Sequence, residues 1–236
     1  SNIDPDGGAG HDYDSLSLWE DARDGDITGT GIEHARCRST GGSADTTKVR
    51  INGWTTNAAN YIHIYTDTGE TYRHNGKWSS TKYRLEITVP SNSTYTLYIN
   101  ENYARVEGIQ IHNIQGAFTD GEAIMIDTMD AGGSDIQLGY IIAKASAFAG
   151  AGVCFGLNST DADSTVTLYN SIFYDFVNGA NLMSSIVVSN GTLNVYNCTV
   201  YNGYRGLRQT GGTAVAKNVI SFGNAGGGTD FTDWAT

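Results

Sequence analysis

Three acidic side chains are the first candidates for chemistry in this sequence. Asp127 directly follows a short apolar run at residues 123–126, and Asp161 and Asp163 lie in a loop before the most regular part of the chain. Glycoside hydrolysis needs two carboxyl groups across a substrate cleft, about 5–5.5 Å or about 6.5–9.5 Å apart. The spacing of these residues along the chain does not determine the distance between their carboxyl groups. The alternative interpretation is that each of them is a solvated aspartate in a turn. We therefore expect no catalytic residue, and Asp127, Asp161 and Asp163 would carry the chemistry if the protein were an enzyme.

Signals for metal binding are sparse. Asp4, Asp6 and Asp12 stand in a Gly-rich opening loop and match a calcium-binding loop only in part, because the distal Glu of such a loop is missing. The five histidines are scattered without metal-ligand spacing, and the three cysteines include no C-x-x-C pair. We expect no cofactor and no metal, and we name the three aspartates as calcium ligands if one binds.

A segment between two strand-like runs concentrates aromatic and cationic side chains in an otherwise acidic chain. It contains Tyr72, Arg73, His74 and Trp78. Such side chains stack on sugar rings or pair with the charges of a partner. The alternative is a hairpin tip in which residues 75–76 (Asn-Gly) form a type I′ turn and Trp78 packs back on the body of the protein.

A second binding candidate lies on outward positions of later strands. Alternation places Tyr169, Tyr196 and Tyr201 on exposed sheet faces, and Tyr204 with Arg205 follows soon after. Stacking of the strands would align Tyr169 with Tyr196 as a flat aromatic strip suited to sugar rings or to a partner subunit. The alternative is that tyrosine simply occupies its usual place on an exposed sheet face.

These side chains must be positioned by a repeated element, which is clearest between residues 165 and 222. Three times an alternating run ends at an asparagine and a second apolar run follows, with pivots at Asn170, Asn197 and Asn218. Weaker copies place pivots at Asn113 and Gly139, so the steps range from 21 to 31 residues. Alternation indicates strands, and a repeat of this length indicates a solenoid or a propeller.

One physical interpretation covers every copy of the repeat. Each coil carries two strands joined at one bent residue, and Asn or Gly enters the left-handed backbone region most cheaply. Stacked coils would then place one Asn above another in a hydrogen-bonded ladder. The repeat therefore predicts a β-solenoid, and the alternative is a β-sandwich with several Asn-bearing turns.

The alternating pattern with an Asn between two strands resembles right-handed parallel β-helix proteins, and the resemblance covers residues 106–222. It implies an all-β fold, a right-handed parallel β-helix with a short N-terminal capping helix. It implies little about function, because that fold hosts lyases, hydrolases, phage tailspikes and passive surface proteins. The opening of the chain also resembles the starts of phage and environmental bacterial β-helix proteins.

We expect a single β-helix domain over residues 1–236. Its parts are an N-terminal loop and capping helix (1–26), irregular first coils with loop excursions (27–105), regular coils (106–222) and a C-terminal cap (223–236). The helix is expected over residues 15–22, because Leu16 and Trp19 share a face, Asp14 or Ser15 can cap it, and Ser17 and Glu20 have capping-box spacing. It would plug the open end of the solenoid, whose strand edges need a cover.

The bulk composition limits the possible partners. A net charge of −11 repels phosphate backbones, which argues against nucleic acid as a partner. No apolar run approaches the roughly 18–20 residues of a membrane span. The sequence begins without a charged-then-apolar signal segment, and a signal removed by processing is the alternative. Thirty Gly with two Pro and 17% charged residues describe tight turns and short strands.

From these observations we expect a non-catalytic structural or attachment protein displayed on a surface. The expected setting is extracellular or on a virion, as a phage decoration, fibre or tail-associated protein. Its partners would be copies of itself, other capsid or surface subunits, and glycans. The alternatives are a polysaccharide-active enzyme (a glycoside hydrolase or a lyase) and a carbohydrate-binding module.

Overall fold

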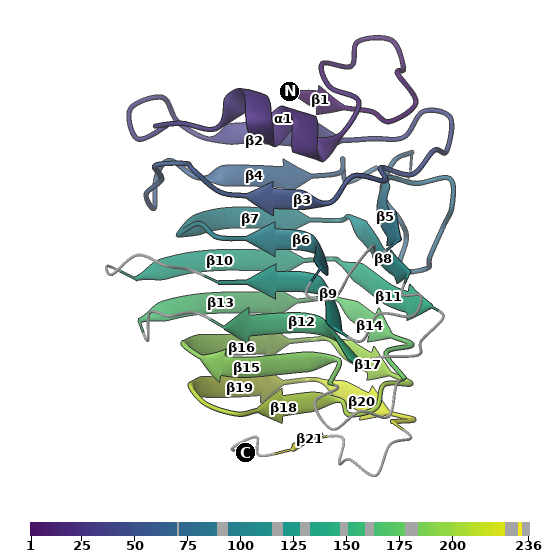
Figure 1. Cartoon of the computed structure of the whole chain (residues 1–236), viewed down its shortest axis with the longest axis vertical. Coiled ribbons are helices and arrows are strands. Elements are labelled where there is room, and N and C mark those ends of the chain that lie inside the picture. Colours follow the sequence, from purple (N-terminus) through teal and green to yellow (C-terminus); the bar gives the residue numbers. More distant parts are fainter. Residues whose placement is uncertain are drawn as a thin grey trace.

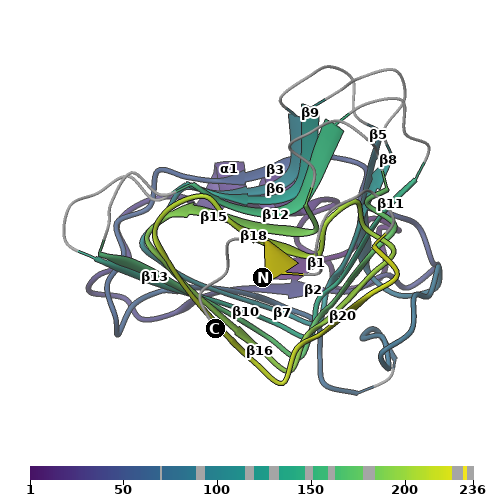
Figure 2. The same ribbon diagram turned by 90° about the horizontal axis from the view of Figure 1, so that it is seen from below.

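Three parallel sheets run along the molecule, and from β4 (Ile62–Tyr65) onward each coil of the chain adds one strand to each sheet (Figure 1). The computed structural model describes residues 1–69, 71–88, 94–114, 120–127, 133–146, 151–158, 163–177, 184–224 and 231–232. Seen along the coil axis, the sheets form the sides of a triangle (Figure 2). The expected all-β parallel β-helix is therefore confirmed.

The strands of each sheet follow one another at intervals of one coil. The first sheet contains β1 (Asn2–Ile3), β2 (Glu33–Cys37), β4 (Ile62–Tyr65), β7 (Tyr103–Glu107), β10 (Ser134–Gly139), β13 (Ser164–Tyr169), β16 (Thr192–Tyr196) and β19 (Thr213–Lys217). The second sheet contains β5 (Arg84–Thr88), β8 (Gln110–Ile114), β11 (Ile142–Ser146), β14 (Ile172–Tyr174), β17 (Thr199–Tyr201) and β20 (Ile220–Phe222). The third sheet contains β3 (Val49–Ile51), β6 (Thr94–Ile99), β9 (Asp120–Ile126), β12 (Ala151–Asn158), β15 (Ile186–Asn190), β18 (Leu207–Gln209) and β21 (Phe231–Thr232).

Alternation along each strand builds the core. In β13, Val166 and Leu168 point inward and are fully buried, and they pair in register with Leu193 and Val195 of β16. Stacked apolar rows of this kind remove apolar surface from water at roughly 25 cal/mol per Å². Cys198 lies in the same core, and burial raises the pKa of its thiol to about 11.

The turn between the first and second sheets forms a column of left-handed residues. Their φ angles are 75° at Gly108, 54° at Tyr140, 50° at Asn170, 53° at Asn197 and 54° at Asn218. The pairing registers of the flanking strands place these five residues one above another. The amide of Asn218 donates to the side-chain oxygen of Asn197 at 3.1 Å, which is one rung of the expected ladder.

The prediction was wrong for two members of this column, Gly139 and Asn113. Gly139 is the last residue of β10 and pairs with Tyr169, so Tyr140 occupies the bend in that coil. Asn113 lies within β8 opposite Ala145, where its buried amide donates to the carbonyl of Glu122 at 3.0 Å. The strand simply continues through Asn113, and the bend of its coil is at Gly108.

The helix α1 (Leu16–Arg23) covers the N-terminal end of the coils (Figure 1). Ser15 caps it, accepting a hydrogen bond from the Leu18 amide at 3.1 Å. Trp19 is fully buried and stacks on Trp54 with ring centroids 5.5 Å apart. The capping box was wrong, because Glu20 turns inward and accepts from the Trp54 indole at 3.2 Å.

Within the part of the chain that the structure describes, no helix combines the length and the apolar character that crossing a bilayer requires.

Candidate functional site

A cleft of about 410 Å³ lies at the corner between the first and second sheets, beneath the loop that follows β4. Loop residues form one wall, and the turn column with the starts of β11 and β14 forms the other. The lining residues are Thr68, Arg73, His74, Asn75, Gly76, Tyr140, Ile141, Ile142, Asn170 and Ile172. The volume is within the usual range for small-molecule sites, about 300–1,000 Å³.

Tyr140 is the unusual residue of this cleft. It holds a φ of 54° in a column where the neighbouring coils have Gly or Asn. A bulky residue in the left-handed region costs of order 1–3 kcal/mol, and such strain clusters at binding and active sites. Tyr140 is also 43% exposed, so its ring faces the cleft instead of the core.

Arg73 holds one side of the Tyr140 ring. Its guanidinium carbon lies 4.7 Å from the ring centroid, in a cation–π arrangement. Gly108 makes room for this side chain, because a Cβ there would lie 2.2 Å from Arg73 Nε. The cation therefore reaches the cleft from the loop by crossing over a glycine of the turn column.

His74 fastens the loop to the same coil. Its Nε2 lies 2.6 Å from the Tyr140 carbonyl oxygen, and its Nδ1 accepts from the Gly76 amide at 3.2 Å. A carbonyl only accepts and an amide N–H only donates, so the ring is neutral with its proton on Nε2. Burial lowers the pKa of His74, and the charge of Arg73 lowers it further against the opposing effect of the Tyr140 carbonyl.

A row of polar and aromatic side chains extends from the cleft over the outer face of the first sheet. The Tyr169 hydroxyl donates to Glu107 at 2.5 Å, and the other oxygen of Glu107 lies 3.6 Å from His63 Nε2. His63 stacks on Tyr65 with centroids 4.5 Å apart, and Arg105 lies 5.0 Å over the ring of Tyr61. This connected row of aromatic and charged side chains was not expected from the sequence.

The expected binding residues fall into separate groups. Arg73 and His74 line the cleft, whereas Tyr72 stands nearby without lining it. Trp78 lies over the second sheet, with its ring edge-on to His112 at 5.6 Å. The turn at residues 75–76 is not type I′, because Gly76 has a positive φ and Asn75 does not.

The tyrosines expected at outward positions lie on two sheets, and the expected alignment of Tyr169 with Tyr196 is confirmed. Tyr169 and Tyr196 are partners in register on the first sheet, and Lys217 lies 5.9 Å over the Tyr196 ring. Tyr201 is on the second sheet, where its ring packs against that of Phe222 with centroids 4.7 Å apart. Tyr204 and Arg205 follow β17, with the guanidinium 5.7 Å over the ring.

The structure does not bring the candidate catalytic carboxylates together as a pair among the residues that it describes. Asp127 accepts a hydrogen bond from the Tyr98 hydroxyl at 3.0 Å, and burial raises the pKa of Asp127. Burial and the contact with Asp127 raise the pKa of Tyr98 to about 12. Asp163 is exposed in the turn before β13, and Asp161 lies outside the described residues.

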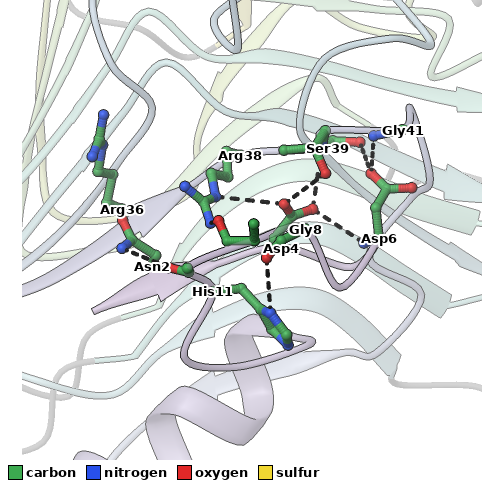
Figure 3. A network of polar contacts seen from close by, with 12 residues as sticks. Asn2, Asp4, Asp6, Gly8, His11, Arg36, Arg38, Ser39 and Gly41 are labelled. Carbon is green, nitrogen blue, oxygen red and sulfur yellow. Dashed lines mark hydrogen bonds and ion pairs between the residues drawn. The ribbon is translucent and has the colours of Figure 1, made fainter.

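The three aspartates considered as calcium ligands instead hold the N-terminal loop together, and Figure 3 shows Asp4 and Asp6 in this network. Asp4 is fully buried, accepts from the Thr40 hydroxyl at 2.9 Å and pairs with Arg38 at 3.4 Å. Asp6 accepts from the Gly41 amide at 2.8 Å, and Asp12 accepts from the amide of Asn2 at 2.7 Å.

Hydrogen-bond donors therefore occupy the oxygens that calcium would need. Burial alone would raise the pKa of Asp6, but hydrogen bonds from Ser43, Ser39 and Gly41 hold it well below its usual range. Among the residues that the structure describes, no group of three or more His, Cys, Asp or Glu is arranged to hold a metal ion.

The sequence contains a signal that could have identified Tyr140, but the expected pivot at Gly139 concealed it. Shifting the pivot from Gly139 by one residue places a tyrosine where the repeat has asparagine, which marks the coil as unusual. Asn170 was expected in the turn column, and the structure shows that it also lines the cleft.

Comparison of the chain with models of protein families, with curated proteins and with solved structures finds no significant match.

Proposed function

We propose that the chain is an attachment protein displayed on a surface, of the phage or bacterial kind, which holds a saccharide in the corner cleft. The observation that carries the proposal is Tyr140, a strained and exposed aromatic residue held between Arg73 and the walls of a cleft. Strain kept at one position of a repeated turn favours a role for that side chain beyond folding.

The chemistry of the cleft suits a polyhydroxylated ring. Arg73 supplies charge-assisted donors, and the exposed amide of Asn170 supplies a donor and an acceptor. Ile172, which is partly exposed, supplies apolar contact for the carbon–hydrogen face of a sugar. A cationic residue in an acidic chain also favours sugars that carry a carboxylate or another anionic group.

The parallel solenoid supports the attachment part of the proposal. Its stacked coils pair strand by strand in three continuous sheets, and α1 covers their N-terminal end, so the cleft lies on a hydrogen-bonded scaffold. Loops held on a rigid scaffold are the usual location of binding residues.

A glycan array probed with the purified protein, followed by calorimetry on the best hit, tests this proposal. Tyr140→Asn should reduce the affinity at least about 10-fold while preserving the fold, because Asn is accepted in the left-handed region. Tyr201→Asn is the matched control, since Tyr201 is 42% exposed but lies away from the cleft. Absence of any glycan hit, or equal loss of affinity in both variants, would contradict the proposal.

A further inference from the structure

Three polar side chains from successive coils are connected by hydrogen bonds on the outer face of the second sheet. Ser146 Oγ lies 2.8 Å from His112 Nε2, and Glu86 Oε2 lies 3.0 Å from His112 Nδ1. Glu86 of β5 and His112 of β8 are partners in register, and Ser146 of β11 stands diagonally two residues beyond the partner Lys144. The order hydroxyl, imidazole, carboxylate is that of a nucleophile, its base and the group that orients the base.

The hydrogen-bonding chemistry fixes the tautomer of His112. An ionised carboxylate only accepts, so Nδ1 carries the proton that bonds to Glu86. Nε2 of a neutral ring then accepts from the hydroxyl of Ser146. This is the tautomer that can remove a proton from the serine.

The charges around His112 agree with a neutral ring beside an ionised acid. Burial lowers the pKa of His112, and Lys144 and Arg84 act in the same direction, whereas Glu86 raises it. Burial opposes ionisation of Glu86, but the contacts with His112 and Arg84 bring the pKa of Glu86 below its ordinary value.

Two further side chains form the surroundings of the triad. Trp78 meets His112 edge-on, and Lys144 Nζ lies 4.2 Å over the Trp78 ring. Trp78 therefore gives the site an apolar side, and Lys144 gives it a positive charge on the same strand face as Ser146. Positive charge beside a serine nucleophile stabilises the oxyanion that forms when the serine attacks a carbonyl.

We propose that Ser146, His112 and Glu86 hydrolyse carboxylic esters, and that their substrates are O-acylated saccharides. The triad itself does not depend on the proposed function, but the saccharide part of the substrate does. Ile142 of the cleft wall and Ser146 lie on the same face of β11, four residues apart, which is about 13 Å along a strand. A glycan chain seated in the cleft would thus carry an ester from a nearby sugar unit to the serine.

The reaction needs no group beyond the triad, the ester and water. Ser146 Oγ attacks the ester carbon while its proton passes to His112 Nε2, and the carbon–oxygen bond to the alcohol then breaks. The alcohol takes the proton from His112 and leaves an acyl-serine. Water attacks the acyl group, its proton passes to His112, the bond to Oγ breaks and Ser146 recovers the proton as the carboxylic acid departs.

The test uses a fluorophosphonate probe, which labels activated serines, and hydrolysis of p-nitrophenyl acetate. We expect the wild type to be labelled at Ser146, as located by peptide mass mapping. Ser146→Ala and His112→Gln should each lower hydrolysis by about 10³-fold or more, and His112→Gln should abolish the labelling. Ser80→Ala is the control, because it removes an exposed loop hydroxyl from outside the triad.

Glu86 acts through His112, so its variant needs a further measurement. Glu86→Gln should lower hydrolysis by about 10²-fold or more and move the acidic limb of the pH profile to lower pH, since Glu86 raises the pKa of His112. A purely structural effect of Glu86→Gln would lower the rate without moving this limb, and that result would remove Glu86 from the triad.

The two proposals fail separately. Wild-type protein without Ser146 labelling and without hydrolysis above the buffer rate would overturn the triad, whatever the glycan array shows. Hydrolysis of p-nitrophenyl acetate together with no glycan binding would support the triad and reject the saccharide. Release of acetate from an O-acetylated glycan, lost in Tyr140→Asn while p-nitrophenyl acetate hydrolysis persists, would support both.

Discussion

The hydroxyl of Tyr169 donates to Glu107 at 2.5 Å, although the strands that carry these two residues are not neighbours in the sheet. Strand β10 lies between them, and Gly139 occupies the aligned position. The Tyr169 ring lies over this glycine, where a Cβ would come within 2.2 Å of the ring. The absence of a side chain at Gly139 thus lets one tyrosine connect three coils.

Replacing Gly139 by alanine should destabilise the protein by about 1–3 kcal/mol, the usual cost of overpacking. The added methyl group would displace the Tyr169 ring and break its bond to Glu107. Urea unfolding followed by circular dichroism measures the change. Gly29→Ala is the matched control, because no atom lies within 4 Å of its Cβ position, and it should leave the midpoint unchanged or slightly raised.

The asparagine ladder predicts a difference between two substitutions at Asn197. Asn197→Ala should cost about 1–2 kcal/mol, because alanine is disfavoured at the φ of 53° and the bond from Asn218 is lost. Asn197→Gly should cost less, because glycine accepts this φ and only the hydrogen bond is lost. Equal costs in urea unfolding would show that backbone strain does not decide the choice of asparagine here.

A control for this comparison lies on the preceding strand. Asn194 points outward from β16 and is not among the left-handed residues. Asn194→Ala should therefore change the free energy of unfolding by no more than about 0.5 kcal/mol.

The parallel solenoid could be predicted from the sequence because its two signals are local. Alternation defined the strands, and Asn170, Asn197 and Asn218 marked the bends of the later coils. At the earlier coil, backbone preference pointed to Gly139, but the glycine serves the ring of Tyr169 from the next coil. Such a requirement comes from a partner 30 residues away in register, which local preference does not reveal.

The cleft and the triad depend on register between coils, and the spacing of residues does not give it. His112 is separated from Glu86 by 26 residues and from Ser146 by 34, with loops of different length in each interval. Only the pairing of β5, β8 and β11 brings the three side chains together. Trp78 was singled out by composition, but its contact with His112 became visible only with the loop folded over the second sheet.

Asp45 connects α1 to the first coils, and its replacement should loosen both. The buried carboxylate accepts from the Leu16 amide at 2.7 Å and from the Tyr83 hydroxyl at 3.0 Å. Asp45→Asn replaces a charged acceptor by a neutral amide whose NH₂ group cannot accept, so we expect a loss of about 2–3 kcal/mol. Urea unfolding measures this loss, and Asp21→Asn, an exposed change on α1, should have almost no effect.

Stability should fall as the pH drops from about 7 to about 5, because three histidines are harder to protonate in the folded state. Burial is the main cause of the lowered pKa of His63, His74 and His112. The unfolded chain, with histidine pKa near about 6.5, then binds more protons than the folded one, so stability rises with pH across this window. The buried acids Glu20 and Asp45 contribute with the opposite sign, since burial raises their pKa.

A difference measurement isolates one histidine from these opposing groups. Glutamine at position 74 supplies a donor for the Tyr140 carbonyl and an acceptor for the Gly76 amide without titrating. We expect the free energy of unfolding of His74→Gln to depend less steeply on pH than that of the wild type between about pH 5 and about pH 7. Parallel curves for the two proteins would mean that His74 titrates alike in the folded and unfolded chains, and the loop would then not be held by its neutral ring.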